Sequence, residues 1–180
     1  FNWSDLDDDC NKSLSDGEDI PGGQVQNTGS VDVTFTIVDE YGVESEFETE
    51  NQNIGGIDGG SETVNDNSSL DSATNHDNET ATYRLDFSDP VTNVDFRVND
   101  IDHDSVVNIV AYDVYGVQIP VILTASGSTD LNLSDTDGVA GVDTASATNN
   151  SGSNTDDDNS ILVEIAGPVA RIEVTHSNDG

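Results

Sequence analysis

The chain has 180 residues, and its 4 Lys and Arg against 37 Asp and Glu give a formal net charge of −33. Nucleic-acid binding needs cations that displace counterions from phosphates, and an anionic membrane repels such a chain, so we expect neither partner. No apolar run approaches the roughly 20 residues of a membrane span, so we expect no membrane insertion. The single Cys10 excludes a disulfide within the chain.

The acidic residues are mostly aspartates, 27 of the 37. Short Asp side chains suit tight turns, and crowding so many of them on one domain costs self-repulsion. Bound divalent cations would offset this repulsion, and Ca²⁺ is the hard cation that prefers carboxylate and amide oxygens. A salt-adapted, solvating surface is the alternative explanation for most of these acids, and the two explanations are compatible.

In chain order, an acidic segment at 1–24 precedes a run at 31–37 in which apolar and polar residues alternate. This two-residue period predicts a β-strand with one buried face. The same pattern, or a short apolar run typical of a central strand, recurs in seven further segments: 43–49, 81–87, 94–98, 106–112, 117–123, 161–165 and 169–175. No segment shows a helical period.

Two turn patterns lie between these runs, and each of them occurs twice. The pattern D-x-Y-G-V stands at 39–43 and at 113–117, with Gly42 and Gly116 supplying the positive φ of a short turn. Pro90 and Pro168 are each expected in a turn just outside a strand ladder. Two polar stretches, 51–78 and 125–160, are expected to be long Asp-, Asn-, Ser- and Gly-rich loops. Together these features predict one all-β domain over 1–180, an antiparallel, jelly-roll-like β-sandwich.

The sharpest candidate for a metal site is Asp100, Asp102 and Asp104, an alternating D-x-D-x-D segment after a strand. Carboxylates this close repel one another unless a cation lies between them, and Ca²⁺ needs 6–8 oxygens. The segment is not an EF-hand, because Ser105 and Ala111 stand where that loop has Gly and Glu. A solvated acidic turn is the alternative.

Weaker metal candidates lie in the long loops and at the end of the chain. They are Asp135 and Asp137 before Gly138, Asp156 and Asp158 before the strand at 161, and Asn178 after the last strand. We therefore expect several Ca²⁺ ions, with solvated turns as the alternative at each place. The sequence identifies no ligand-binding residues.

Catalysis is not expected. The chain has neither a G-x-S-x-G elbow nor a phosphate-binding loop, and Cys10 lies in an acidic segment that raises a thiol pKa. With so many acids, a pair of neighbouring carboxylates carries no information about hydrolysis. The three His residues lack the short spacing of zinc sites.

Several segments resemble a family of secreted bacterial modules: LDFSDPVTNVDF at 85–96, DID at 100–102, VAYD at 110–113 and GPVARIEV at 167–174. They are similar to the Ca²⁺-dependent peptide-binding domains of large RTX adhesins. The resemblance implies a non-catalytic extracellular module of a longer chain at the bacterial surface, active in cell adhesion and biofilms. It further implies Ca²⁺-dependent capture of peptide or protein C-termini on other cells, with Asp100 and Asp102 as metal ligands.

Three other functions stay open at this point. A lectin-like module would use Ca²⁺ to bridge sugar hydroxyls, and a structural spacer would use Ca²⁺ only to rigidify its ends. A hydrolase would need a cleft with one carboxyl of raised pKa.

Overall fold

The computed structural model describes residues 1–6, 13–53, 57, 65–74, 76–126, 130–149 and 159–178. Almost all of its regular structure is antiparallel β-strand, which confirms the predicted all-β sandwich. In the described residues, no helix is long and apolar enough to span a membrane.

A short 3₁₀ helix, η1 (Trp3–Asp5), comes first in the chain. The strands follow in this order: β1 (Glu18–Asp19), β2 (Gln24–Asn27), β3 (Asp32–Tyr41), β4 (Glu44–Glu48), β5 (Ser69–Ala73), β6 (Thr80–Val91), β7 (Val94–Val98), β8 (Ser105–Tyr112), β9 (Gln118–Ile119), β10 (Ile122–Ala125), β11 (Leu131–Ser134), β12 (Thr144–Ala147), β13 (Ile161–Ile165) and β14 (Val169–Asn178).

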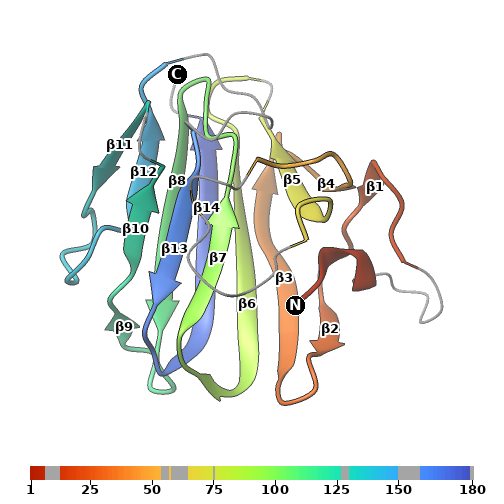
Figure 1. The fold of residues 1–180 in the computed structure, drawn as a ribbon, viewed down its shortest axis with the longest axis vertical. Helices are drawn as coiled ribbons and strands as arrows, with labels where there is room; N and C mark the ends of the chain where they lie inside the picture. The colour runs from red at the N-terminus through yellow and green to blue at the C-terminus, as the bar shows by residue number, and fades with distance from the viewer. Residues whose placement is uncertain are drawn as a thin grey trace.

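One broad sheet forms the back of the molecule in Figure 1, with the order β11-β12-β8-β14-β6-β3-β2 and β9 beside the end of β8. Two small sheets complete the fold, β10-β13-β7 in front and β1-β4-β5 at the upper right. Chain neighbours are therefore often not sheet neighbours: β14, the last strand, lies between β6 and β8.

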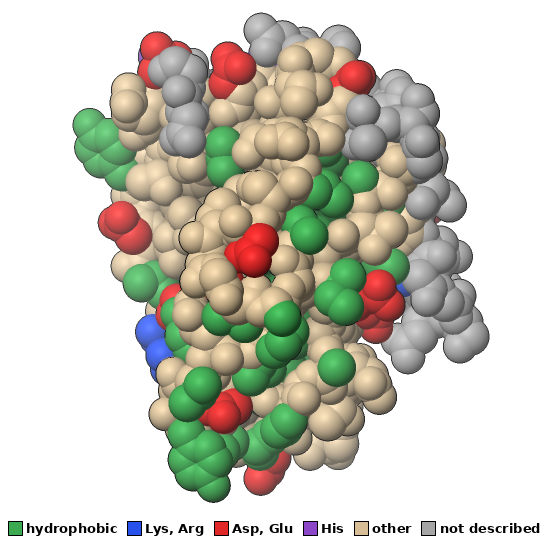
Figure 2. All heavy atoms as spheres, turned by 90° about the vertical axis from the view of Figure 1, so that its left-hand side faces the viewer, with side chains coloured by type: hydrophobic (Ala, Val, Ile, Leu, Met, Phe, Trp, Pro, Cys, Tyr) green, Lys and Arg blue, Asp and Glu red, His purple; other side chains and the backbone are tan. Residues whose placement is uncertain are grey.

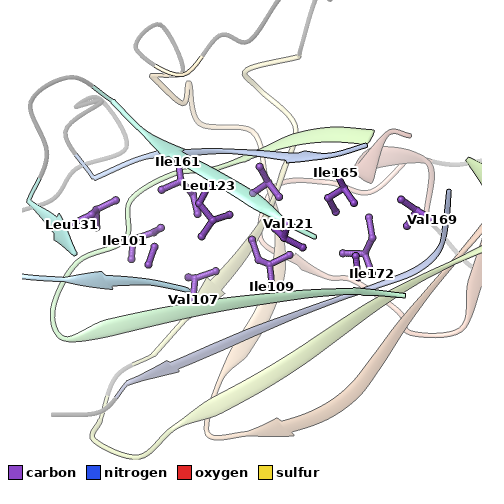
Figure 3. Close-up of a cluster of buried hydrophobic side chains, with 13 residues drawn as sticks. Ile101, Val107, Ile109, Val121, Leu123, Leu131, Ile161, Ile165, Val169 and Ile172 are labelled. Atoms are coloured by element: carbon purple, nitrogen blue, oxygen red, sulfur yellow. The ribbon is translucent and has the colours of Figure 1, made fainter. Parts of the chain in front are cut away.

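The first core fills the space between the broad sheet and β10-β13-β7 (Figure 3). Ile109 and Ile172 from the broad sheet face Ile161, Val163 and Ile165 of β13, and these side chains are fully buried. Each such side chain contributes about 1.5–3 kcal/mol by leaving water. Leu123 of β10, Leu131 of β11 and Ala145 of β12 belong to the same core, so these three strands are packed against it.

A second core lies under the same broad sheet. Phe35 of β3 and Tyr83 of β6 stack with ring centroids 6.1 Å apart, and Trp3 meets Phe35 edge-on at 5.3 Å. Leu6 and Phe47 complete the cluster together with Leu14, Ile20, Val43 and Ala81. The acidic segment at 1–24 thus contributes to the fold, because Leu6, Leu14 and Ile20 are buried.

The structure corrects the two predicted long loops. Residues 51–78 contain β5, and 125–160 contain β11 and β12. Strand β12 (TASA) is built from small and polar side chains, and β5 (SLDSA) has Leu70 as its single large apolar residue, so neither shows the apolar pattern that marks a strand in sequence. They form because their backbones complete ladders with β4, β11 and β8.

Proline positions differ in part from expectation. Strand β6 continues through Pro90 to Val91, and the turn comes at Thr92 and Asn93, with Asn93 at φ +55°. Pro90 is tolerated there because the ladder with β14 is already shifted in register at this point. Pro168 lies in a turn between β13 and β14, as predicted. The predicted strand at 117–123 is split, because Pro120 separates β9 from β10.

Candidate metal centre

The loop between β11 and β12, residues 135–143, closes into a compact unit against β10. The backbone N–H of Asp143 donates to the Ser134 carbonyl at 3.2 Å, and that of Val142 donates to the Val121 carbonyl at 3.1 Å. At Gly141 any side chain is excluded, because its φ is +131° and a Cβ would lie 2.0 Å from the Val121 carbonyl oxygen. The loop therefore lies tightly against the start of β10.

Asp143 organises this loop from inside. Asp143 is 4% exposed, and its carboxylate accepts hydrogen bonds from the Thr136 hydroxyl (2.7 Å), the Asn108 amide (3.2 Å) and the Thr144 hydroxyl. The other side of the carboxylate accepts the backbone N–H groups of Thr136 (3.0 Å) and Asp137 (3.2 Å). A buried carboxylate with this many donors is a fixed anion that holds the loop in shape.

These hydrogen bonds also decide the charge of Asp143. Burial alone would raise its pKa, but the donors from Thr144 and Thr136 and the amide of Asp137 outweigh burial and lower the pKa. Asp143 is therefore ionised at neutral pH.

Two further carboxylates converge on Asp143. Each of Asp135, Asp137 and Asp143 has a carboxylate oxygen within 4.8 Å of the other two, and this is the one such acidic group among the described residues. Asp135 accepts the Gly138 N–H at 2.9 Å and Asp137 accepts the Val139 N–H at 2.7 Å, which fixes both side chains at the loop surface. The group thus has one buried and two exposed members.

The donor set fits a hard divalent cation. It consists of carboxylate oxygens without His or Cys, which suits Ca²⁺ or Mg²⁺ and not Zn²⁺. Asp135 and Asp137 each accept one of these loop hydrogen bonds, and a carboxylate has about four acceptor sites, so both retain capacity for an ion. The Asp143 carboxylate already accepts hydrogen bonds from five donor groups, so Asp135 and Asp137 would supply the ligand oxygens and Asp143 its nearby negative charge. Water would supply the rest of the 6–8 oxygens of Ca²⁺.

Sequence reasoning found Asp135 and Asp137 but missed Asp143. The sequence gives little indication of Asp143, which is a single Asp just before a strand of small residues and eight positions after Asp135. Only the pairing of Ser134 with Thr144 shows that the two ends of the loop meet.

The D-x-D-x-D segment forms a tight turn between β7 and β8. Asp100, His103 and Asp104 have positive φ values of 59°, 49° and 63°. Ile101 anchors the turn, with its side chain in the first core and its N–H donating to the Asn159 carbonyl at 3.0 Å. Asp102 is 2.7 Å from His103 Nδ1. Within the described part of the chain, Asp100, Asp102 and Asp104 do not gather their oxygens within 4.8 Å.

Asp100 nevertheless lies in a strongly negative environment. Desolvation, with the charges of Asp102 and Asp71, raises its pKa. Desolvation and the charges of Asp71 and Glu50 likewise raise the pKa of Glu48, and desolvation raises that of Asp71. At Asp100 the like charges of Asp102 and Asp71 thus add to the effect of desolvation.

Asn178, the last predicted ligand, lies beside this turn. Its amide Nδ2 donates to the His103 carbonyl at 3.1 Å, and its backbone pairs with Asn78 and Glu79. It therefore connects the end of β14 to the acidic turn. The predicted ligands Asp156 and Asp158 lie outside the described residues.

His176 lies in a polar network at the same end of β14. Its Nδ1 is 2.9 Å from the Ser72 hydroxyl and its Nε2 is 3.2 Å from the Ser105 hydroxyl. Burial lowers its pKa, so the imidazole is neutral at pH 7. Ser72 continues the network to Tyr83 at 2.8 Å.

No protein-family model, no curated protein and no solved structure matches this chain. The resemblance to adhesin domains stays a prediction from the sequence motifs.

Proposed function

We propose that this chain is a non-catalytic, Ca²⁺-dependent ligand-binding module of a secreted bacterial adhesin. The observation that carries the proposal is the convergence of Asp135, Asp137 and Asp143 in one loop that closes on itself. The motifs at 85–121 and 167–174 supply the adhesin assignment, and the charge of −33 agrees with an extracellular protein that meets millimolar Ca²⁺.

The loop at 135–143 is preorganised for an ion. Asp143 holds the backbone of Thr136 and Asp137, and this fixes the position of the two exposed carboxylates before any ion arrives. A preorganised group loses little freedom on binding, which favours affinity. Ca²⁺ suits the position better than Mg²⁺, because it accepts irregular oxygen geometry and Mg²⁺ demands an octahedron.

An ion at this place would also allow an anionic ligand to bind. A surface with this negative charge repels a peptide carboxylate, whereas a Ca²⁺ ion with open coordination positions reverses the local field. Asp135 and Asp137 are exposed, so an ion held by them stays accessible to a ligand. In this account the C-terminus of a peptide on a neighbouring cell completes the coordination.

Calorimetric titration of the EDTA-treated chain with Ca²⁺ and with Mg²⁺ tests the metal. We expect saturable Ca²⁺ uptake that loses one site in the variant Asp135→Asn/Asp137→Asn. The control Asp89→Asn removes an exposed acid from β6 and should bind like the wild type. Equal uptake by the double variant and the wild type would contradict the assignment of this loop.

A panel of peptides with free or amidated C-termini, and of glycans, tests the ligand with and without Ca²⁺. Capture of free C-termini only in Ca²⁺ supports the proposal. Ca²⁺-dependent capture of glycans would favour the lectin-like function, and Ca²⁺ uptake without any capture would favour a spacer.

A further inference from the structure

The turn between β8 and β9 carries an unusual apolar surface. Val114, Tyr115 and Val117 are 54%, 87% and 59% exposed, and Ile122 at the start of β10 is 53% exposed. We call Val114, Tyr115 and Val117 the apolar tip. Figure 2 shows hydrophobic side chains gathered over the lower half of the face that contains β9 and β10. Turns normally expose polar residues, and grouped exposed apolar side chains mark interaction sites.

The conformation of the turn does not depend on the side chains of the apolar tip. Asp113 accepts the N–H groups of Tyr115 at 2.8 Å and Val117 at 2.9 Å, and its carbonyl accepts the Gly116 N–H at 3.0 Å. Gly116 supplies the positive φ of 74°. Asp113 and Gly116 therefore define the turn and hold the apolar tip in one conformation.

The chain contains its own comparison for this turn. The D-x-Y-G-V pattern at 39–43 has Glu40 where the second copy has Val114. Its Val43 is 7% exposed and belongs to the second core, whereas the equivalent Val117 is exposed. The pattern thus folds with a charged residue and a buried Val, so the apolar tip is a property of the second copy alone.

Charge identifies the chemistry of the occupant. Asp113 lies within the turn, and the exposed Glu164 lies directly opposite Ile122 on the neighbouring strand. The three Arg residues all form ion pairs with aspartates, namely Arg84 and Arg171 with Asp86, and Arg97 with Asp95. A second copy of this chain, at −33, would be repelled from such a surface, and a Lys- or Arg-bearing partner would be attracted.

We propose that the apolar tip is a docking surface for a protein partner whose contact face has an apolar centre and a Lys/Arg rim. The apolar side chains supply the buried centre of such an interface, Asp113 supplies a negative charge within the turn, and the net charge of −33 attracts a basic rim. The surface is formed without any ion, so this proposal is independent of the metal centre.

The test is a titration of the ¹⁵N-labelled full chain with three synthetic 15-residue peptides, followed by NMR at physiological salt. One peptide contains Leu, Trp and Lys, the second has Glu in place of Lys, and the third has Ser in place of Leu and Trp. We expect the first peptide alone to shift the amide signals of 113–118. The double variant Val114→Ser/Tyr115→Ser should weaken this binding about tenfold or more, as expected for central interface residues.

The matched control is Tyr41→Ser, which removes the equivalent Tyr, 68% exposed, from the first copy of the turn and should change affinity less than about twofold. All these side chains are exposed, so the melting temperatures should stay within a few degrees of wild type. The proposal is overturned if the first peptide shifts no signal of 113–118, if the tip variant binds as well as wild type, or if the Glu peptide binds equally well. Dimerisation in sedimentation that Tyr115→Ser abolishes would also overturn it, in favour of a second copy.

Discussion

Replacing Asp143 by Asn should destabilise the fold and disorder the metal-site loop, although the two side chains have nearly the same size. One carboxylate oxygen accepts the Asn108 amide and the hydroxyls of Thr136 and Thr144, and the other accepts the backbone N–H groups of Thr136 and Asp137. An Asn side chain has only one oxygen. If its NH₂ group takes the second position, it faces two backbone N–H groups that cannot rotate away. If the NH₂ group takes the first position, the two hydroxyls can turn to accept from it, but it still faces the Thr136 backbone N–H, 3.2 Å from that oxygen.

The magnitude follows from the bonds that are lost. Two hydrogen bonds to a charged acceptor contribute about 1.5–3 kcal/mol each, and water at the exposed Thr136 and Asp137 recovers part of this. We expect a loss of about 3 kcal/mol in the free energy of unfolding. For a chain of this length that corresponds to a fall of about 6–12 °C in melting temperature.

Thermal unfolding followed by circular dichroism in EDTA at pH 7 measures this effect without any contribution from an ion. The control Asp135→Asn removes an exposed carboxylate from the same loop and should change the free energy of unfolding by about 0.5 kcal/mol or less. The pKa of Asp143 is lower in the folded state than its ordinary value of 3.8. The wild-type advantage should therefore be complete above pH 4 and disappear as the pH falls through the lowered pKa. A melting temperature within 2 °C of wild type at pH 7 would refute the view that Asp143 holds this loop.

Three further predictions follow from other parts of the fold. Gly141→Ala should lower the melting temperature strongly and weaken Ca²⁺ uptake, because its Cβ would meet the Val121 carbonyl. The control is Gly138→Ala, at φ +75° with open space around it, which should lower the free energy of unfolding by only about 1 kcal/mol. Asp71→Asn should raise the melting temperature in EDTA at pH 7, since the raised pKa of Asp71 reports desolvation and repulsion of its charge, which Asn removes. An unchanged melting temperature would show that this repulsion is negligible. The pKa of His176 is lowered in the folded chain, so the unfolded chain binds a proton at this residue first, and the free energy of unfolding should fall as the pH drops below 6.5. Urea titrations at several pH values should find a smaller fall in the free energy of unfolding for His176→Gln than for wild type. Equal falls would contradict the burial argument.

The strands that were predicted correctly are those in which the pattern of large apolar residues is strong. The alternation at 31–37 became β3, and the apolar run at 106–112 became β8, because each residue's own side chain decides which face it buries. Strands β5 and β12 could not be predicted this way. Apart from Leu70 in β5, their residues are small or polar, and they form strands because neighbouring strands offer free backbone groups.

The arrangement of the strands depends on contacts between distant segments, which a single sequence does not reveal. Nothing in the periodicity shows that β14 lies between β6 and β8, or that one sheet covers two cores. The same limit applied to the metal centre. Asp135 and Asp137 stand out as an acidic turn, but the role of Asp143 arises from the pairing of β11 with β12 and from its burial beside Asn108.

The most direct test of the central claim is a crystal structure of the chain grown in millimolar Ca²⁺, with anomalous differences measured to identify the ion. The account predicts an anomalous peak among Asp135, Asp137 and Asp143, with carboxylate oxygens at about 2.3–2.6 Å from it. Water alone at that position, in crystals grown at saturating Ca²⁺, would contradict the claim and leave Asp143 as an anchor of the loop only.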